Sequence, residues 1–283
     1  IAPMTDAPEA LLSLPTGTRG AGRFRYGAAM ALYQQGLLSP MELEAWRIAS
    51  ASDTRPVDQV LAAHGLPSPA SRKADPATAL PRLMQEATAT LAPLRCPGAA
   101  ELRRLLARRD DTPLPCPART LPVVTRHLAA ALTALSATRP ALAAAILSAS
   151  PQLHWRPDGG SPDPEGSALC TLMGKGAPFP ADDAEFGLIL IAPHGMQRDH
   201  SHAAPELYLP LTGPHGWRFG PDRPLICKPA REPVWIDAHR PHLIKAGATP
   251  FLALYGRTRE AQSATHTLPA SDWPVLQALR LEA

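Results

Sequence analysis

Closely spaced cysteine pairs are absent from this chain of 283 residues. Its four cysteines, Cys96, Cys116, Cys170 and Cys227, lie far apart and form no CxxC motif. This spacing disfavours a zinc ribbon or a dithiol redox motif, and the chain is too long to be a small disulfide-linked scaffold. We therefore expect the cysteines to be free thiols that are buried in the protein.

Lysine is also scarce, because only four of the 28 basic residues are lysines. The net charge is +3, which is small for a chain of this length. The densest basic cluster, formed by Arg103, Arg104, Arg108 and Arg109, has no aromatic residues between its arginines. Such a cluster is typical of a solvated helix face, and we expect no nucleic-acid partner.

Long apolar runs are missing as well. No run approaches the roughly 20 residues that a helix needs to cross a bilayer. The first residues, from Ile1 onwards, also lack the basic stretch followed by an apolar stretch that is typical of a secretory signal peptide. The sequence therefore predicts a soluble, cytoplasmic protein without a membrane partner.

Helical spacing dominates the first 150 residues or so, which are rich in Ala, Leu and Arg. Ser39 can cap a helix, Pro40 suits the first helical position, and Glu42 completes a capping box. Prolines between residues 66 and 76 predict a linker. The other predicted helices cover residues 23–35, 57–64, 77–91, 99–109 and 121–147.

The sequence pattern changes after Pro151, from helical spacing to short β-type runs. Short β-type runs follow one another about every eight to ten residues, separated by Gly, Pro and Asp, as in a sandwich, jelly roll or barrel. The predicted strands cover residues 187–192, 207–211, 217–219, 225–227, 234–236, 242–245 and 251–255. The predicted fold class is α+β, with a helical N-terminal half and a C-terminal β-barrel of the jelly-roll type.

The sequence predicts that the chain divides into three structural parts. Residues 1–75 form a helical extension, residues 76–150 form a helical segment that packs on the barrel, and residues 151–283 form the barrel. No helix-turn-helix with a basic recognition face is present in the extension. We therefore expect the extension to cover the barrel or to build a homodimer.

A cluster of metal-binding residue types occurs between two of the predicted strands. Side chains two apart on a strand share a face, so His200 and His202 can direct both imidazoles to one point. A turn at Pro205 would bring the chain back, and there Glu206 and Tyr208 again share a face. Two neutral imidazoles and a carboxylate suit a divalent transition metal such as Fe, Zn, Mn, Ni or Co.

A fourth ligand would come from a later strand, where His242 follows Pro241. Three histidines and one glutamate leave one or two positions on the metal open, as a catalytic site requires. The spacing resembles the first motif of the cupin superfamily, which would run here from Gly195 through the two histidines and Glu206 to Gly213. The predicted barrel is therefore a cupin barrel.

The second cupin motif is less regular. The proline and glycine that usually stand five and three residues before the late histidine are here Asp237 and His239. His239 is therefore an alternative to His242 as the fourth ligand. The remaining histidines have no ligand spacing and are expected at the surface or behind the ligands: His154, His194, His215 and His266.

Tyr208, two residues after Glu206, indicates which family within the cupin superfamily this chain resembles. Together with the dipeptide Pro241-His242 and the predicted strand at residues 249–255, it makes residues 80–257 resemble the cupin-type dimethylsulfoniopropionate (DMSP) lyases of the DddL and DddQ group. The resemblance implies one divalent transition metal held by His200, His202, Glu206 and His242. It also implies a small zwitterionic substrate, and Tyr208 as the base of a β-elimination that yields dimethyl sulfide and acrylate.

Several of these lyases have a second tyrosine about three residues before the first ligand histidine, and this chain has Gln197 there. Tyr255 lies on a later strand, either near the site or in the core. Two alternatives to the lyase stay open: a cupin enzyme with another substrate, such as a dioxygenase or isomerase, and a non-catalytic ligand-binding cupin.

Further residues are candidates for binding the substrate. Arg198 and Lys245 could bind an anionic group if they face the barrel interior. An aromatic wall would attract a sulfonium cation, and three tryptophans could provide it or could simply be core residues. These are Trp155, Trp217 and Trp235.

Overall fold

The computed structural model describes residues 11–66, 76–109, 112–159, 161, 163 and 165–281. The chain divides into two compact units. One comprises Ile1–Glu86 and Leu132–Ser150, and the other comprises Ala87–Ala131 and Pro151–Ala283. Most of the predicted linker, residues 67–75, lies outside the described residues, and the three-part division stays a prediction.

Three short helices dominate the described part of the first unit before residue 67. They are α2 (Ala21–Gln34), α3 (Pro40–Ala49) and α4 (Val57–Ala63). The capping box at α3 is confirmed, since the Glu42 N–H donates to Ser39 Oγ at 3.2 Å and the Ser39 N–H donates to Glu42 Oε2 at 2.6 Å. Two orphan backbone donors at the helix start are thereby satisfied.

The long helix predicted for residues 121–147 is wrong, because two helices occupy this range. They are α7 (Pro122–Ser136) and α8 (Pro140–Ala149). Proline disfavours the helical conformation in the preceding residue, and Arg139 accordingly has φ −142° and ψ 67°. Pro140 then begins the second helix, where its missing N–H costs nothing. The predicted helices at 77–91 and 99–109 are confirmed as α5 (Pro76–Leu91) and α6 (Ala99–Ala107).

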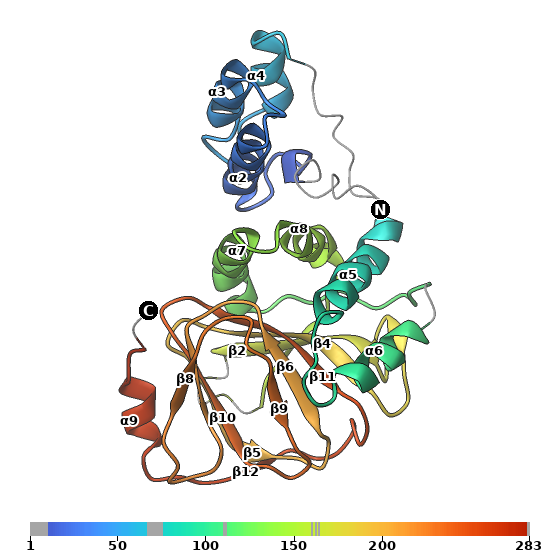
Figure 1. Cartoon of the computed structure of the whole chain (residues 1–283), viewed down its shortest axis with the longest axis vertical. Helices are drawn as coiled ribbons and strands as arrows, with labels where there is room; N and C mark the ends of the chain where they lie inside the picture. Colours follow the sequence, from blue (N-terminus) through green and yellow to red (C-terminus); the bar gives the residue numbers. More distant parts are fainter. Residues whose placement is uncertain are drawn as a thin grey trace. The chain divides into compact units, whose positions relative to one another are not determined.

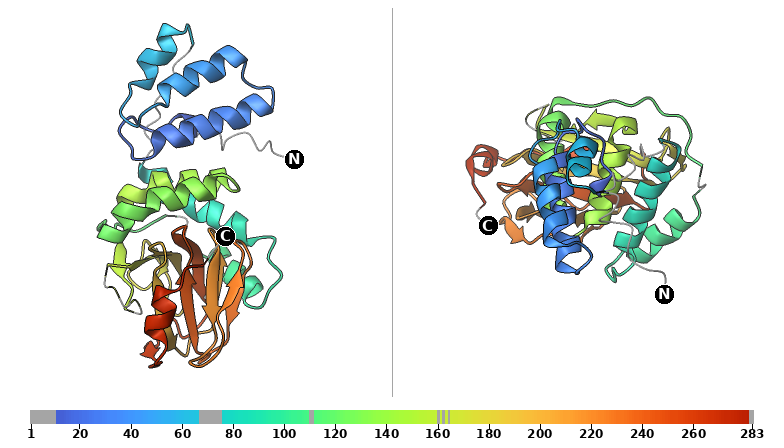
Figure 2. Two further views of the ribbon diagram at one scale, coloured as in Figure 1. Left: turned by 90° about the vertical axis from the view of Figure 1, so that its left-hand side faces the viewer. Right: turned by 90° about the horizontal axis from the view of Figure 1, so that it is seen from above.

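The second unit contains the β-barrel, built from two sheets whose strands are mainly antiparallel (Figures 1 and 2). The first sheet has the order β1-β2-β4-β11-β6-β9 with β3 beside β2, and the second has the order β12-β5-β10-β7-β8. The strands of the first sheet are β1 (Trp155–Pro157), β2 (Ser167–Gly174), β3 (Phe179–Pro180), β4 (Glu185–Ile191), β6 (Glu206–Pro210), β9 (Val234–Ile236) and β11 (Phe251–Arg257). Those of the second are β5 (Met196–Ser201), β7 (His215–Arg218), β8 (Ile226–Lys228), β10 (His242–Ala246) and β12 (His266–Thr267). All seven predicted strands are present, and the predicted α+β class is confirmed.

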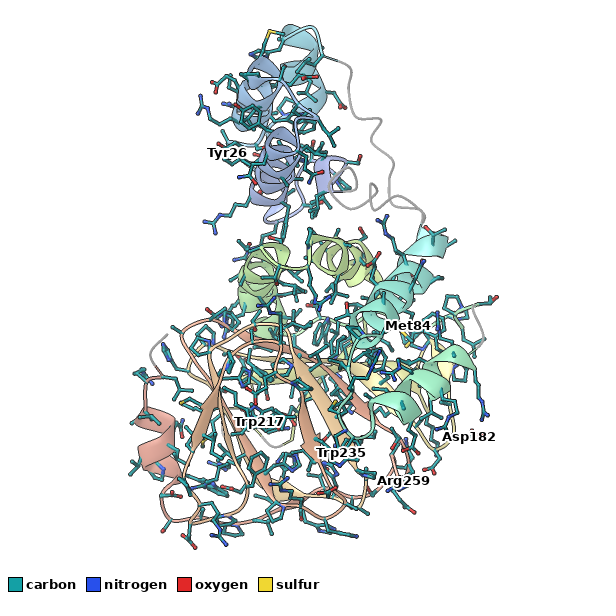
Figure 3. All side chains as sticks on the ribbon, in the orientation of Figure 1. Tyr26, Met84, Asp182, Trp217, Trp235 and Arg259 are labelled. Carbon is teal, nitrogen blue, oxygen red and sulfur yellow. The ribbon has the colours of Figure 1, made fainter. Side chains whose placement is uncertain are left out.

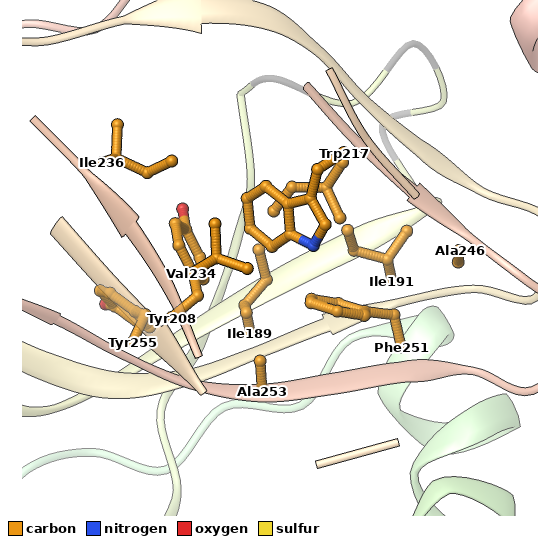
Figure 4. Close-up of a cluster of buried hydrophobic side chains, with 11 residues drawn as sticks. Ile189, Ile191, Tyr208, Trp217, Val234, Ile236, Ala246, Phe251, Ala253 and Tyr255 are labelled. Atoms are coloured by element: carbon orange, nitrogen blue, oxygen red, sulfur yellow. The ribbon is translucent and has the colours of Figure 1, made fainter. Parts of the chain in front are cut away.

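The barrel interior holds a cluster of buried apolar and aromatic side chains from both sheets (Figure 4). Its buried members are Ile189, Ile191, Tyr208, Trp217, Val234, Ile236, Ile244, Ala246, Phe251, Ala253 and Tyr255. They follow the period-two rule, because alternate residues of β11 and of β9 point to this cluster. The interior is thus apolar at its centre.

Helices cover the outer faces of the barrel. On the first sheet, α6 lies so close to β11 that a Cβ on Gly256 would come within 2.6 Å of Leu102 Cδ2. On the second sheet, the outer side chains of β5 and β10 pack with α9 (Trp273–Ala278), which the sequence did not predict (Figure 2). A helix thus packs on the outer face of each sheet.

The described cysteines are all free, as predicted. The prediction that they are buried is right for Cys170 and wrong for Cys227, which is exposed. Among the described helices, none combines the length and the apolar character that a membrane span requires. The cytoplasmic location and the homodimer stay predictions.

Candidate metal centre

The predicted ligands come from three strands that the fold brings together. His200 lies on β5 and His202 directly follows it, Glu206 begins β6, and His242 begins β10. Strands β5 and β10 are paired, with His242 opposite His200. One ligand atom from each histidine lies within 4.8 Å of those of the other two, and all three side chains are buried. The turn at Pro205 then places Glu206 beside them.

Backbone carbonyls fix the orientation of all three imidazoles. The Nδ1 atoms of His200, His202 and His242 lie 2.8, 2.7 and 3.0 Å from the carbonyl oxygens of Arg198, Ala204 and Arg240. A carbonyl oxygen can only accept, so each Nδ1 carries a proton, and in the neutral form of each imidazole Nε2 is the atom with the lone pair. This arrangement is the usual way to prepare a histidine for metal binding through Nε2.

The contacts around Glu206 fit a cation. Its Oε2 lies 3.0 Å from Nε2 of His202 and 3.8 Å from Nε2 of His242. Nε2 of His242 is buried and has no hydrogen-bond partner among the described residues. The Nε2 atoms of two imidazoles and a carboxylate oxygen thus converge, and a divalent ion between them could be bound by all three. These residues fit a metal, and the donor set leaves its identity open.

The protonation states suit metal binding. Burial lowers the pKa of His242 well below its ordinary value and also lowers that of His200, so both imidazoles stay neutral. Burial alone would raise the pKa of Glu206, but the Arg257 guanidinium holds it below its ordinary value. The site therefore offers a carboxylate and the two neutral imidazoles of His200 and His242 at neutral pH.

Tyr208 lies beside this centre in the barrel interior. Its ring centroid is 6.3 Å from that of His242, 5.1 Å from that of Trp217 and 6.5 Å from that of Tyr255. Tyr208 and Tyr255 are opposite each other on β6 and β11 and are seen side by side in Figure 4. The sequence left open whether Tyr255 lies near the site or in the core, and the structure places it in the interior core cluster next to Tyr208.

A row of charged side chains, unforeseen from the sequence, crosses the first sheet next to the tyrosines. Arg257 on β11 is opposite Glu206 on β6 and Glu185 on β4, and its Nε donates to Glu206 Oε1 at 3.0 Å. Glu185 Oε1 accepts from the Tyr255 hydroxyl at 2.5 Å and from Arg156 Nη2 at 2.9 Å. The barrel interior thus has a charged end beside the predicted ligands.

The family model for dimethylsulfoniopropionate lyase matches residues 99–253, which is more than half of the chain. The chain belongs to this family. The crystal structure of the DMSP lyase DddQ from Ruegeria pomeroyi DSS-3 is similar over 68% of this chain and 96% of that one, with 23% identity and a TM-score of 0.54. A structure described as belonging to the DMSP lyases RdDddP and RnDddQII is similar over 69% and 100%, with 19% identity and a TM-score of 0.53. These likenesses support the fold, and no curated protein matches the sequence.

Gln197 stands where several DMSP lyases have a second tyrosine, and it faces the barrel interior. It is opposite the core residue Ile244. Its Nε2 donates to Asp158 Oδ2 at 2.9 Å, and Ser167 Oγ donates to the same oxygen at 3.0 Å. Gln197 Oε1 is buried without a hydrogen-bond partner among the described residues. The position therefore carries a buried amide and carboxylate in place of a phenol.

Arg198 and Lys245 do not face the interior, so they cannot bind a substrate there. A β-bulge between β5 and β10 changes the register before His200, and Arg198 stacks on the Trp273 ring of α9 at 4.7 Å. Lys245 Nζ donates to the carbonyl oxygens of His194 and Gln277, at 2.5 and 3.0 Å. Both cations hold outer segments to the barrel.

The three tryptophans differ in position, and Figure 3 labels two of them, Trp217 and Trp235. Trp217 is fully buried in the interior cluster, whereas Trp235 packs outside β9 on Gly98, where a Cβ would clash with its ring. Trp155 is opposite Cys170, on the outer face of the sheet. Among the three, only Trp217 can line the interior.

His239 was the alternative to His242 as the fourth ligand. The His239 side chain is exposed, and the structure groups His242, not His239, with the other two histidines.

His215, expected at the surface or behind the ligands, is not at the surface. It is fully buried, with its ring 5.3 Å from that of Phe251. Its Nδ1 accepts from Trp217 Nε1 at 2.9 Å, and its Nε2 donates to the Pro229 carbonyl oxygen at 3.1 Å. Both ring nitrogens are used by the neutral form, and burial lowers the pKa of His215 to about 4.

This depressed pKa predicts a loss of stability in mild acid. The unfolded chain binds a proton at this histidine below about pH 6.5 and the folded chain does not, so the free energy of unfolding falls as the pH drops from about 6.5 towards 4. Between about pH 7.5 and pH 5, wild type should lose about 2 kcal/mol more than His215→Gln. Urea unfolding of both metal-free proteins at the two pH values measures this difference, and equal losses would refute it.

Proposed function

We propose that the protein is a carbon–sulfur lyase that cleaves dimethylsulfoniopropionate by β-elimination into dimethyl sulfide and acrylate. Family membership supports this substrate. The observation that carries the chemistry is the position of Tyr208, within the barrel interior and next to three converging histidines and Glu206. An acid–base side chain beside a metal site is the arrangement that proton abstraction next to a carboxylate requires.

In this proposal His200, His202, Glu206 and His242 hold one divalent transition metal. The metal, when bound, would supply positive charge that stabilises anionic forms of the groups beside it. Tyr208 is the general base. Burial, followed by the nearby Glu206 carboxylate, raises its pKa well above 10 in the absence of a cation, so its function as a base depends on a filled metal site.

The proposed elimination can be written bond by bond. The Tyr208 phenolate takes the proton from the carbon next to the substrate carboxylate, and the electrons of that C–H bond form the new C=C bond. The C–S bond breaks and its electron pair leaves with sulfur as dimethyl sulfide. No oxidant or reductant is consumed. Trp217 and Tyr255 offer aromatic faces near Tyr208, to which a sulfonium cation is attracted.

The direct test uses purified protein whose metal content has been measured. Metal-loaded protein is incubated with dimethylsulfoniopropionate, dimethyl sulfide is measured in the headspace and acrylate in solution. We expect the two products in equal amounts, with no oxygen uptake. Metal-loaded protein that releases neither product would contradict the proposal.

Gln197 supports a second candidate, a cupin enzyme with another substrate. The buried pair of Gln197 and Asp158 offers hydrogen bonds that a tyrosine at this position would not offer. Oxygen uptake with an iron-loaded protein, or isomerisation of a substrate without dimethyl sulfide release, would favour this candidate.

A further inference from the structure

Among the described residues, Arg257 is the basic side chain that forms an ion pair with a predicted metal ligand, Glu206. It is the last residue of β11, and its side chain keeps 14% of its surface exposed, whereas Glu206 is 1% exposed. The Nε donates to Glu206 Oε1 at 3.0 Å, which leaves Glu206 Oε2 directed towards His202. One edge of the guanidinium thus holds the carboxylate that belongs to the metal centre.

The other edge of this guanidinium is available. Within the part of the chain that the structure describes, the two Nη groups of Arg257 make no hydrogen bond or ion pair. An arginine guanidinium keeps its positive charge in proteins, so Arg257 is a permanent cation. Two parallel N–H groups on a fixed guanidinium match the two oxygens of a carboxylate.

The other basic side chains considered near the barrel interior already have partners in the protein. Arg198 and Lys245 lie on the outer face, held by Trp273 and by backbone carbonyls. Arg156 donates to Glu185 Oε1 at 2.9 Å, and its side chain is 44% exposed. Arg257 alone, among these four, contacts a predicted metal ligand.

We propose that the two Nη groups of Arg257 bind the carboxylate of the substrate while its Nε holds Glu206. The identity of that substrate rests on the proposed lyase function, but the carboxylate site does not. A carboxylate on these Nη groups lies beside Glu206 and on the side of the sheet that carries Tyr208. Arg257 is thus a substrate-binding residue that also positions one ligand.

The first experiment measures binding of acrylate, a simple carboxylate, to the metal-free protein by calorimetry or NMR titration into the high millimolar range. The variants are Arg257→Gln, Arg257→Lys and the matched control Arg156→Gln, which removes a nearby cation that does not contact Glu206. We expect Arg257→Gln to weaken binding by about ten- to a hundredfold, Arg257→Lys by less, and Arg156→Gln by less than about threefold. Near-ultraviolet circular dichroism checks that each variant is folded, and Arg257→Lys preserves the buried charge if Arg257→Gln does not fold.

The second experiment separates substrate binding from positioning. In metal-loaded protein, a carboxylate-binding role predicts that Arg257→Lys raises KM for dimethylsulfoniopropionate more than it lowers kcat. Wild-type protein that binds no acrylate without metal, or variants that bind acrylate as well as wild type, would overturn the proposal. Weaker zinc binding with unchanged acrylate binding would also overturn it, because Arg257 would then only position Glu206. If wild type binds acrylate through Arg257 but releases no dimethyl sulfide, the carboxylate site stands and the lyase function fails.

Discussion

Replacing Tyr208 by phenylalanine should reduce dimethyl sulfide release by about a hundred- to ten-thousandfold, the usual contribution of a positioned general base. The change removes only a hydroxyl group. The ring, 5.1 Å from that of Trp217 within the interior cluster, keeps its packing. Because Tyr208 is not among the predicted ligands, the metal content should be unchanged. The expected loss is therefore in kcat, with the site filled.

The matched control is Tyr255→Phe. Tyr255 is also fully buried and is paired with Tyr208, but its hydroxyl donates to Glu185 rather than towards the histidines. We expect this variant to lose less than about tenfold in kcat, mainly because Glu185 loses a hydrogen-bond donor. Headspace gas chromatography, together with metal analysis of each variant, measures both effects. A Tyr208→Phe protein that keeps its metal and its rate would exclude Tyr208 as the base.

The candidate centre could be predicted because it depends on short-range geometry. His200 and His202, two residues apart, and then Glu206 and Tyr208, two apart after a turn, needed only the period of a strand and the presence of Pro205. Even here the structure differs in detail, since β5 ends at Ser201 and His202 lies just beyond it. The backbone carbonyl of Ala204, two residues on, orients that imidazole instead.

The direction of side chains before His200 could not be predicted. In a regular strand Arg198 would share the face of His200, but the β-bulge opposite Leu243 turns it outwards and turns Gln197 inwards. A bulge depends on how two strands distant in the sequence pair, and neither strand shows it alone. Gln197, three residues before His200, shares the interior face with that histidine because of this bulge.

Arg257 was missed for the same reason. The predicted strand ended at residue 255, and nothing near Arg257 in the sequence marks it as a partner of Glu206. Their contact arises from the pairing of β11 with β6, across about 50 residues of chain. Strand β2 (Ser167–Gly174) was missed because it is buried on both faces, and its small and apolar residues show no alternation.

Replacing His242 by alanine should cost the protein its metal, and the same change at His239 should not. Nε2 of His242 is the buried acceptor that lacks a partner, and it converges with His202 on Glu206 Oε2. The His239 side chain is exposed, and only its backbone N–H, which donates to the His202 carbonyl oxygen, is tied to the site. Alanine keeps that backbone group. We therefore expect a loss of metal affinity of more than about a hundredfold for His242→Ala and less than about threefold for His239→Ala.

Two independent measurements check this pair. Metal content after dialysis, with zinc or manganese as the probe, reports occupancy directly. Thermal unfolding with and without added metal reports it through linkage, since a ligand that binds only the folded chain raises the unfolding temperature. Added metal should stabilise wild type and His239→Ala and leave His242→Ala unchanged. The reverse result would assign the fourth position to His239, and the left-handed backbone at His239, with φ 61°, would then have to change to bring its imidazole inwards.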